Sequence, residues 1–175
     1  MNPAKIAYSY RMGTTQDIPQ IQEISIAAYA QFRPVISQDN WEKWKLNFEK
    51  ESTFLDLFKI ATCYVCEFED QLCGVAFFIP SGNPFLLFEK DWSYIRYLGV
   101  SPEHEGKGIG KKLTQNCIAK AIENNESVIA LHTSEFQNAA RHIYESLGFV
   151  KQQEFEHYDK RYWIYKFNLN GNNKI

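Results

Sequence analysis

Apolar residues recur along this chain at two spacings, one typical of amphipathic helices and one typical of strands, and stretches of each kind follow one another. Near the N-terminus, helically spaced isoleucines follow Asp17, which predicts a helix with Asp17 as its N-cap and Pro19 in its first turn. A longer helical region, rich in Trp and Phe, is expected over residues 39–58, with a break near Glu51-Ser52. Further helices are expected over residues 108–124 and 138–147.

Runs with the alternation or apolar content of strands lie before, between and after these helices. A Glu69-Asp70 turn is expected between the second and third runs, and residues 80–84 read as a loop. The expected strands are 8–12, 61–68, 72–79, 93–100, 128–133, 149–157 and 161–169. The last of them alternates, with Tyr162, Ile164 and Lys166 on one face and Trp163, Tyr165 and Phe167 on the other.

The resulting order of elements, β-α-α-β-β-β-α-β-α-β-β, predicts an α/β fold with a mixed sheet. A chain of 175 residues without an evident linker is expected to form one domain over residues 1–175. Residues 168–175 are expected to be a polar tail.

The most informative segment is a glycine-rich turn between an expected strand and an expected helix. The apolar run 95–100 ends at Ser101-Pro102, and Gly106, Gly108 and Gly110 follow before a helix-like stretch. Glycine allows close backbone approach, and the first N–H groups of a helix have no partner inside it. Such a turn favours an anion, in particular a phosphate. The alternative is an ordinary glycine turn beside a solvated lysine cluster.

Two common phosphate-binding motifs do not fit this spacing. A dinucleotide fingerprint needs a third glycine where the chain has Lys111. A P-loop needs a glycine five residues before the Gly-Lys pair, at the place of Glu105, and a Ser or Thr where the chain has Lys112.

The segment resembles motif A of the GNAT family of N-acetyltransferases, Arg/Gln-x-x-Gly-x-Gly/Ala. Glu105 takes the Arg/Gln place, Gly108 and Gly110 take the glycine places, and Val100-x-Pro102 is the strand ending. The resemblance implies that backbone N–H groups here hold the pyrophosphate of acetyl-coenzyme A (acetyl-CoA). It implies the cofactor-binding residues Leu98, Gly99, Val100, Glu105, Gly106, Lys107, Gly108, Ile109, Gly110, Lys111, Gln137 and Asn138.

A second segment resembles GNAT motif B, Asn-x-x-Ala-x-x-x-Tyr-Glu-x-x-Gly-Phe, from Gln137 to Phe149. Gln137 occupies the usual Asn position, and Asn138 stands one residue late. Tyr144 matches the tyrosine and also lies on an apolar helical stripe, so it is either a core residue or the general acid that protonates the departing thiolate. With both motifs present, Tyr144 is predicted to be catalytic.

The resemblance implies a GNAT fold whose fourth and fifth strands splay apart to admit the pantetheine arm of the cofactor. The backbone of Leu98 and Val100 would pair with that arm, and an N–H near Leu98 would polarise the thioester carbonyl. The implied reaction is acetyl transfer to the primary amine of a small molecule or of a peptide or protein N-terminus. No acid occurs within the expected strand 93–100, which leaves Glu103, His104, His157 and a water chain as alternatives for the base.

The resemblance places the acceptor between the first two helices, the loop after the third strand and the last hairpin. The aromatic residues there either form a cleft for an amine or belong to the core. They are Tyr29, Phe32, Trp41, Trp44, Phe85, Phe88, Tyr158 and Tyr162. Acidic residues that could hold a cationic acceptor, or be solvated surface, are Asp39, Glu89, Asp91 and Glu156.

Composition and charge narrow the classes of function and location that remain. A net charge of −2 and a pI near 6.1 give no overall attraction to nucleic acid or to an anionic membrane. We expect a cytoplasmic protein that uses no metal, because the sequence has neither a signal pattern nor a membrane-length apolar run, and its cysteines do not pair as a zinc site. A homodimer is one expected assembly. A non-catalytic coenzyme A-binding module of the same fold and an unrelated phosphate-binding α/β domain remain as alternatives to an active acetyltransferase.

Overall fold

The structure is a computed structural model that describes residues 7–170. Its centre is a seven-stranded sheet in the order β1-β2-β3-β4-β5-β7-β6, in which only β4 and β5 pair in parallel. The strands are β1 (Ser9–Met12), β2 (Thr62–Phe68), β3 (Gln71–Ile79), β4 (Ser93–Val100), β5 (Val128–Ser134), β6 (Val150–His157) and β7 (Lys160–Asn168). The helices are α1 (Ile18–Ala30), α2 (Gln38–Glu49), α3 (Glu51–Phe58), α4 (Ile109–Glu123) and α5 (Asn138–Ser146).

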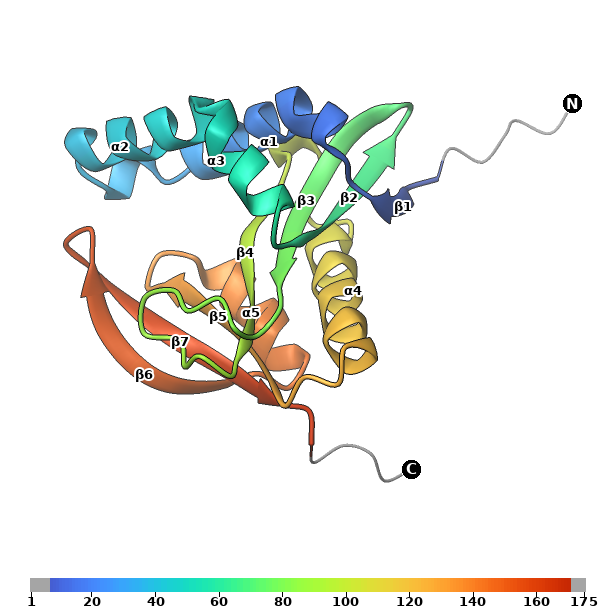
Figure 1. The fold of residues 1–175 in the computed structure, drawn as a ribbon. Helices are drawn as coiled ribbons and strands as arrows, with labels where there is room; N and C mark the ends of the chain where they lie inside the picture. Colours follow the sequence, from blue (N-terminus) through green and yellow to red (C-terminus); the bar gives the residue numbers. More distant parts are fainter. Residues whose placement is uncertain (1–6, 171–175) are drawn as a thin grey trace, which may run out of the picture.

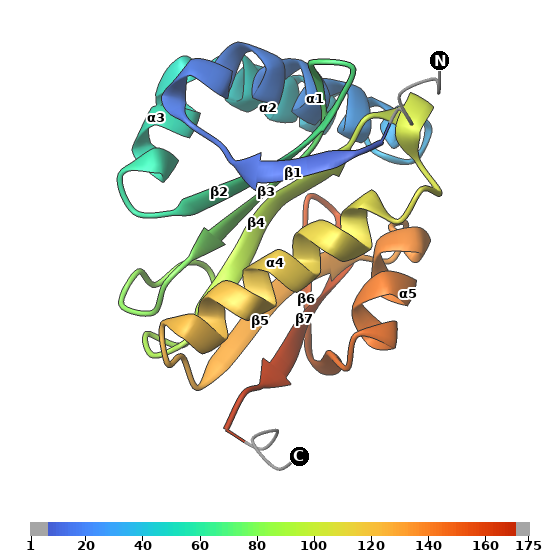
Figure 2. The same cartoon turned by 90° about the vertical axis from the view of Figure 1, so that its right-hand side faces the viewer.

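Helices cover both faces of this sheet. α1 packs on β3 and β4, with α2 and α3 against α1 on the same side (Figure 1). α4 crosses the opposite face, and α5 lies beside α4 in front of the C-terminal strands (Figure 2). The mixed sheet with helices on both faces confirms the predicted fold class.

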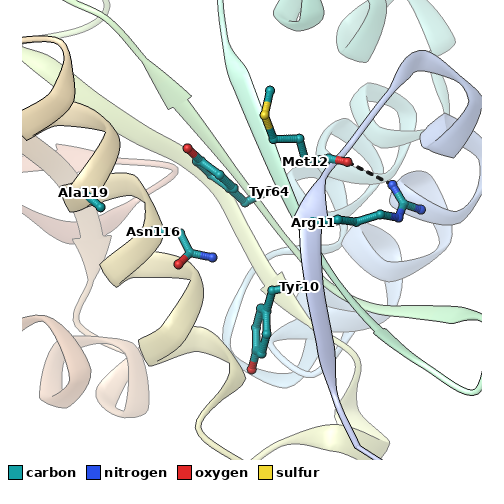
Figure 3. Close-up of a pocket in the computed structure, with 6 residues that line it drawn as sticks. All are labelled: Tyr10, Arg11, Met12, Tyr64, Asn116 and Ala119. Atoms are coloured by element: carbon teal, nitrogen blue, oxygen red, sulfur yellow. Dashed lines mark hydrogen bonds between the residues drawn. The ribbon is translucent and has the colours of Figure 1, made fainter.

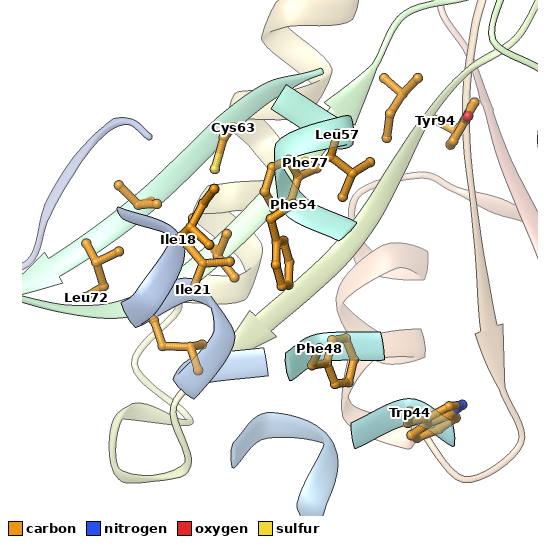
Figure 4. Close-up of a cluster of buried hydrophobic side chains, with 14 of the residues drawn as sticks. Ile18, Ile21, Trp44, Phe48, Phe54, Leu57, Cys63, Leu72, Phe77 and Tyr94 are labelled. Carbon is orange, nitrogen blue, oxygen red and sulfur yellow. The ribbon is translucent and has the colours of Figure 1, made fainter. Parts of the chain in front are cut away.

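Two hydrophobic cores result, one on each face. β3 contributes to both, because successive side chains of a strand point to opposite faces: Val75 and Phe77 enter the first core under α1–α3, and Ala76 and Phe78 enter the second core under α4 and α5. Figure 4 shows the first core. Its labelled members are Ile18, Ile21, Trp44, Phe48, Phe54, Leu57, Cys63, Leu72, Phe77 and Tyr94.

Local sequence signals predicted most boundaries. The helical region 39–58 is broken, as expected, but at Lys50, whose ψ of 112° is not helical. The Glu69-Asp70 turn is confirmed, and both residues have the positive φ values of a tight hairpin turn, 51° and 62°. Cys63 and Cys66 point to opposite faces, Cys63 into the first core and Cys66 into the second.

Two local expectations differ from the structure. Asp17 stands at the N-cap position of α1 but makes no capping bond to α1; its carboxylate accepts hydrogen bonds from Arg11 and from the Thr14 N–H, the second as part of a capping box of the 3-10 turn Thr15–Asp17. A charged donor outcompetes the helix N–H groups for this side chain. The polar tail does not begin at residue 168, because Asn168 belongs to β7 and Leu169 is buried in the second core. Residues 171–175 lie outside the described residues.

The sheet is split near its middle. β4 and β5 pair only at Ser93↔Ile129 and Tyr94↔Ala130, after which the two strands separate. β3 continues to pair with β4, and β7 continues to pair with β5, up to the ends of both strands. The gap between β4 and β5 beyond Tyr94, here called the opening, is the splay that the resemblance implied.

Candidate active site

Hydrogen bonding to β3 decides which backbone groups of β4 face the opening. The N–H of Ser101 donates to the carbonyl oxygen of Cys73 at 2.8 Å. In an antiparallel pair every second residue bonds to the same neighbour, so Gly99, opposite Val75, also turns its backbone groups toward β3. The N–H and C=O groups of Leu98 and Val100 therefore face the opening. Gly99, expected among the cofactor-binding residues, lies at a close-packing position, where an added Cβ would lie 3.4 Å from the Cβ of Ala28 on α1.

A β-bulge lies where β4 borders the opening. Val75 pairs with Gly99 and Phe77 with Arg96, so Tyr97 and Leu98 together oppose one residue of β3. Tyr97, the first residue of this bulge, has a left-handed φ of 50°. The Tyr97 hydroxyl accepts hydrogen bonds from Asn47 at 2.9 Å and Arg96 at 3.0 Å. α2 thus helps to hold the bulge.

The glycine turn has the geometry of an anion cradle. Gly106 and Gly108 have left-handed φ values of 71° and 79°, and no atom lies within 4 Å of the place where either would carry a Cβ. The first backbone bond of α4 runs from the N–H of Lys112 to the carbonyl of Gly108, so the N–H groups of residues 109–111 precede the helical ladder. Free N–H groups at the start of a helix favour an anion, so the turn has the geometry that was expected of it.

The flanking residues of the turn take three different positions. Gly110 lies where α4 approaches α5, because its Cβ would meet the Ile143 side chain at 3.4 Å. Lys107 and Lys111 are exposed beside the turn and supply positive charge. The carboxylate of Glu105 accepts a hydrogen bond of 3.1 Å from the Gln31 amide, just past the end of α1.

The amides of motif B are occupied by local contacts. The Gln137 carbonyl oxygen accepts from the Ser134 N–H at 3.0 Å and the Ser134 hydroxyl at 2.8 Å, which ties the start of α5 to the end of β5. The side-chain oxygen of Asn138 bonds to Arg141. These contacts give each amide oxygen a structural partner within the chain.

Tyr144 lies in the second core and is 6% exposed. Within residues 7–170, its hydroxyl makes no side-chain hydrogen bond, and it is not among the fully buried polar atoms that lack a partner. Burial raises the pKa of Tyr144, with further contributions from Tyr29 and Cys117, so the phenol stays protonated at neutral pH.

On the first-core face beside the opening, aromatic rings form a box around His132. The ring of His132 lies 6.1 Å from that of Phe88, 6.3 Å from that of Phe155 and 5.9 Å from that of Tyr162. We call Phe85, Phe88, Tyr94, His132, Phe155 and Tyr162 the aromatic box.

Of the aromatic residues expected to form either a cleft or core, half are core. Trp41, Trp44, Phe88 and Tyr162 are at most 8% exposed. Tyr29, Phe32, Phe85 and Tyr158 are half-buried and remain available to an acceptor. None of the four expected acidic residues joins them, because Asp39, Glu89, Asp91 and Glu156 are all exposed.

Of the candidate bases, the structure brings only His157 close to the box. Its ring lies 5.3 Å from that of Tyr162. His104 instead bonds to the Tyr8 hydroxyl at 3.0 Å and packs on Phe68, and Glu103 is exposed on the turn before α4.

His132 was missed by sequence reasoning, because a single His in an expected strand carries no motif. Burial, Arg96 and His157 lower its pKa to about 3, so its ring is neutral at pH 7.

A separate hollow of about 230 Å³ lies at the other edge of the sheet, between β1, β2 and α4 (Figure 3). Its lining residues are Tyr10, Arg11, Met12, Tyr64, Asn116 and Ala119. β1 is the edge strand, three strands away from the opening, so this hollow belongs to neither the cradle nor the aromatic box.

Comparison with known proteins identifies the family. The sequence model described as "Acetyltransferase (GNAT) family" matches residues 19–149, which include the opening, the cradle and α5. The chain belongs to this family. The resemblance read from motifs A and B is confirmed, and an unrelated phosphate-binding domain is excluded.

Curated relatives match parts of this GNAT chain. N-acetyltransferase family 8 member 3 of Rattus norvegicus is 34% identical over 92 residues, 53% of this chain and 40% of the relative. N-acetylaspartate synthetase of Danio rerio is 41% identical over 64 residues, 37% of this chain and 23% of the relative. The chain thus spans less than half the length of these relatives.

Solved structures share the GNAT fold over nearly the whole chain. The PaiA N-acetyltransferase from Thermoplasma acidophilum, in complex with coenzyme A, has a TM-score of 0.76 at 13% identity and covers 93% of this chain and 99% of its own. The ribosomal-protein-S18-alanine N-acetyltransferase from Escherichia coli has a TM-score of 0.71 at 17% identity, covering 97% and 99%.

Two further features concern membranes and metals. Within residues 7–170, no helix combines the length and apolarity needed to cross a bilayer. The same residues contain no cluster of three or more His, Cys, Asp or Glu side chains arranged for a metal ion. Cytoplasmic location and the expected single domain stay predictions.

Proposed function

We propose that this chain transfers an acetyl group from acetyl-CoA to the primary amine of a small molecule or of a peptide or protein N-terminus. The observation that carries the proposal is the separation of β4 from β5 after Tyr94, which leaves the backbone groups of Leu98 and Val100 directed into the opening beside the glycine cradle. Family membership supports the same reaction class, as do the names of the N-acetyltransferase relatives.

Binding is assigned to the backbone. The N–H groups from Gly106 to Lys111 would hold the pyrophosphate, with Lys107 and Lys111 as nearby charge, and Leu98 and Val100 would pair with the pantetheine arm as an added strand would. Acetyl-CoA supplies an activated thioester, and the Leu98 N–H would donate to its carbonyl oxygen. A preorganised donor of this kind is worth about 10²–10³ in rate.

Proton transfer is assigned to Tyr144 and the amine. The buried phenol of Tyr144 is protonated at neutral pH and can donate to the departing thiolate. No carboxylate lies in the aromatic box, so the amine would reach the thioester in its neutral form, with His157 as the candidate base nearest to the box. Attack is direct, from amine nitrogen to acetyl carbon.

Thiol release measures this function. Purified protein would be incubated with acetyl-CoA and a panel of primary amines, and free coenzyme A would be followed over time. Amine-dependent release with the acetylated amine seen by mass spectrometry is expected. Stabilisation by acetyl-CoA and coenzyme A, but not by NAD, without any acetylated product would replace the proposal with a non-catalytic coenzyme A-binding module.

A further inference from the structure

Arg96 is a cation at the opening without an anionic partner. It lies on β4, two residues beyond the last pair with β5, and is half-buried. Its guanidinium carbon stands 3.9 Å from the centre of the Phe85 ring and 4.7 Å from that of Tyr97. Within residues 7–170, no carboxylate oxygen comes within 4.0 Å of an Arg96 nitrogen.

The hydrogen-bonding capacity of Arg96 is mostly unused. A guanidinium has five N–H donors in a planar fork. One nitrogen donates to the Tyr97 hydroxyl, and no other acceptor for the group is found in the described part of the chain. Stacking on Phe85 and the Tyr97 bond fix the orientation of the fork while leaving most of its donors available.

The titratable groups that respond to the charge of Arg96 are neutral at pH 7. Arg96 lies within electrostatic range of Tyr29, Tyr94 and His132, because its charge lowers the pKa of each of them. Burial has the larger effect on all three pKa values. Two of these groups are phenols and the third is a neutral imidazole. A half-buried guanidinium among neutral aromatic rings attracts a carboxylate more strongly than an exposed one does.

We propose that Arg96 binds a carboxylate of the acceptor, so that the acceptors of this chain are small amines that also carry a carboxylate, with an apolar part that packs against the half-buried rings of Phe85 and Tyr97. The inference rests on the proposed function in that the bound molecule is the acetyl acceptor. Arg96 and Leu98 flank Tyr97 at the bulge of β4, so one small acceptor could place its carboxylate at Arg96 and its amine near Leu98.

Matched acceptors test this inference. Phenylalanine, phenylalaninamide and 2-phenylethylamine present the same ring and a primary amine, but only the first has a carboxylate. We expect kcat/KM for phenylalanine to exceed that for phenylalaninamide by about tenfold or more, as a charge-assisted bidentate contact provides. Rates are compared per neutral amine, because the amide has the less basic amine and therefore the larger neutral fraction at a given pH. An equal or reversed preference would overturn the inference.

Variants of Arg96 test whether the preference for an acceptor with a carboxylate depends on this residue. Arg96→Gln should remove the preference by lowering kcat/KM for phenylalanine, and Arg96→Lys should retain part of it. Arg161→Gln is the matched control, because Arg161 pairs with Glu154 on the opposite face of the sheet. Arg96→Gln should leave coenzyme A affinity and the unfolding temperature near those of the wild type. An unchanged preference in Arg96→Gln, or a loss confined to coenzyme A affinity, would contradict the assignment.

A binding measurement separates this inference from the proposed function. N-acetylphenylalanine and N-acetylphenylalaninamide would be titrated by calorimetry into protein saturated with coenzyme A. Tighter binding of the carboxylate, lost in Arg96→Gln, supports the inference even if no amine is acetylated, in which case only the proposed function fails. Equal affinities, or no binding of either compound, would overturn the inference even if acetyl transfer is observed.

Discussion

The hydroxyl of Tyr165 donates to the carboxylate of Glu145 at 2.7 Å, which links β7 to α5 one residue beyond Tyr144. Tyr165 and Tyr144 both belong to the second core. Within residues 7–170, Tyr165 has a side-chain hydrogen-bond partner and Tyr144 has none. The Tyr165 hydroxyl is therefore structural, and the Tyr144 hydroxyl is the candidate proton donor.

We predict that Tyr144→Phe lowers kcat at least about tenfold, because the thiolate would leave without a positioned proton donor. Coenzyme A affinity and stability should change little, since the hydroxyl has no partner to lose. Steady-state kinetics and calorimetry check both points. Turnover equal to that of the wild type would remove Tyr144 from the mechanism.

Tyr165→Phe is the matched control for this experiment. Loss of its bond to Glu145 should lower the free energy of unfolding by about 1 kcal/mol, measured by urea denaturation, while kcat is retained. A fall in kcat as large as that of Tyr144→Phe would mean that both substitutions act through the packing of α5.

Gly108→Val should weaken coenzyme A binding by at least about tenfold, because the side chain would fill the open space in front of the cradle. Gly82→Val separates this effect from backbone strain. Gly82 has a similar φ of 91°, an equally open Cβ position and a place in the loop after β3. Both variants should lose similar stability, but only Gly108→Val should lose affinity by calorimetry. Equal affinities would contradict the cradle.

Asp17→Asn should lower the free energy of unfolding at pH 7 by about 1–2 kcal/mol, because hydrogen bonds from Arg11 hold the pKa of Asp17 below its ordinary value. A lowered folded-state pKa contributes stability above the unfolded pKa of about 3.9, and this contribution is lost as pH falls through the folded value. Urea unfolding at pH 7 and near pH 3 should therefore show a difference between wild type and variant that shrinks on acidification. Asp56→Asn, at an exposed pair with Lys59, should change stability little at either pH.

The four cysteine thiols should be unreactive in the folded protein. All are free and buried, and burial raises the pKa of each, that of Cys73 to about 12. The thiolate is the reactive form, so a chromogenic disulfide reagent should label the native protein slowly and all four thiols in denaturant. Fast native labelling would contradict this burial and would also disturb the thiol-release assay.

Sequence reasoning worked best where a signal is local. The Glu69-Asp70 hairpin, the break between α2 and α3 and the two faces of β7 depend on neighbouring residues, and all three are confirmed. Asp17 shows the limit of such signals. Its role as the N-cap of α1 was predicted from its position before that helix. In the structure its carboxylate instead accepts a hydrogen bond from Arg11 on the edge strand β1.

The candidate site could be predicted only in part. The glycine turn and Tyr144 carry motifs that are readable in order along the chain. Arg96 and His132 have no motif, and both gain meaning only because β4 and β5 separate beside the rings of Phe85 and Phe88.

The sequence by itself determined the order of elements, the family and the cradle, since periodicity, glycine conformation and short motifs act over a few residues. Only the tertiary structure decided that Gly99 pairs with β3 and packs on α1, and that the Gln137 side chain accepts a hydrogen bond from the end of β5. It also decided that Arg96 lies at the opening, where no carboxylate of residues 7–170 pairs with it. The physical reason is that side-chain partners and local charge depend on which distant segments pack together, and spacing along one segment does not specify this.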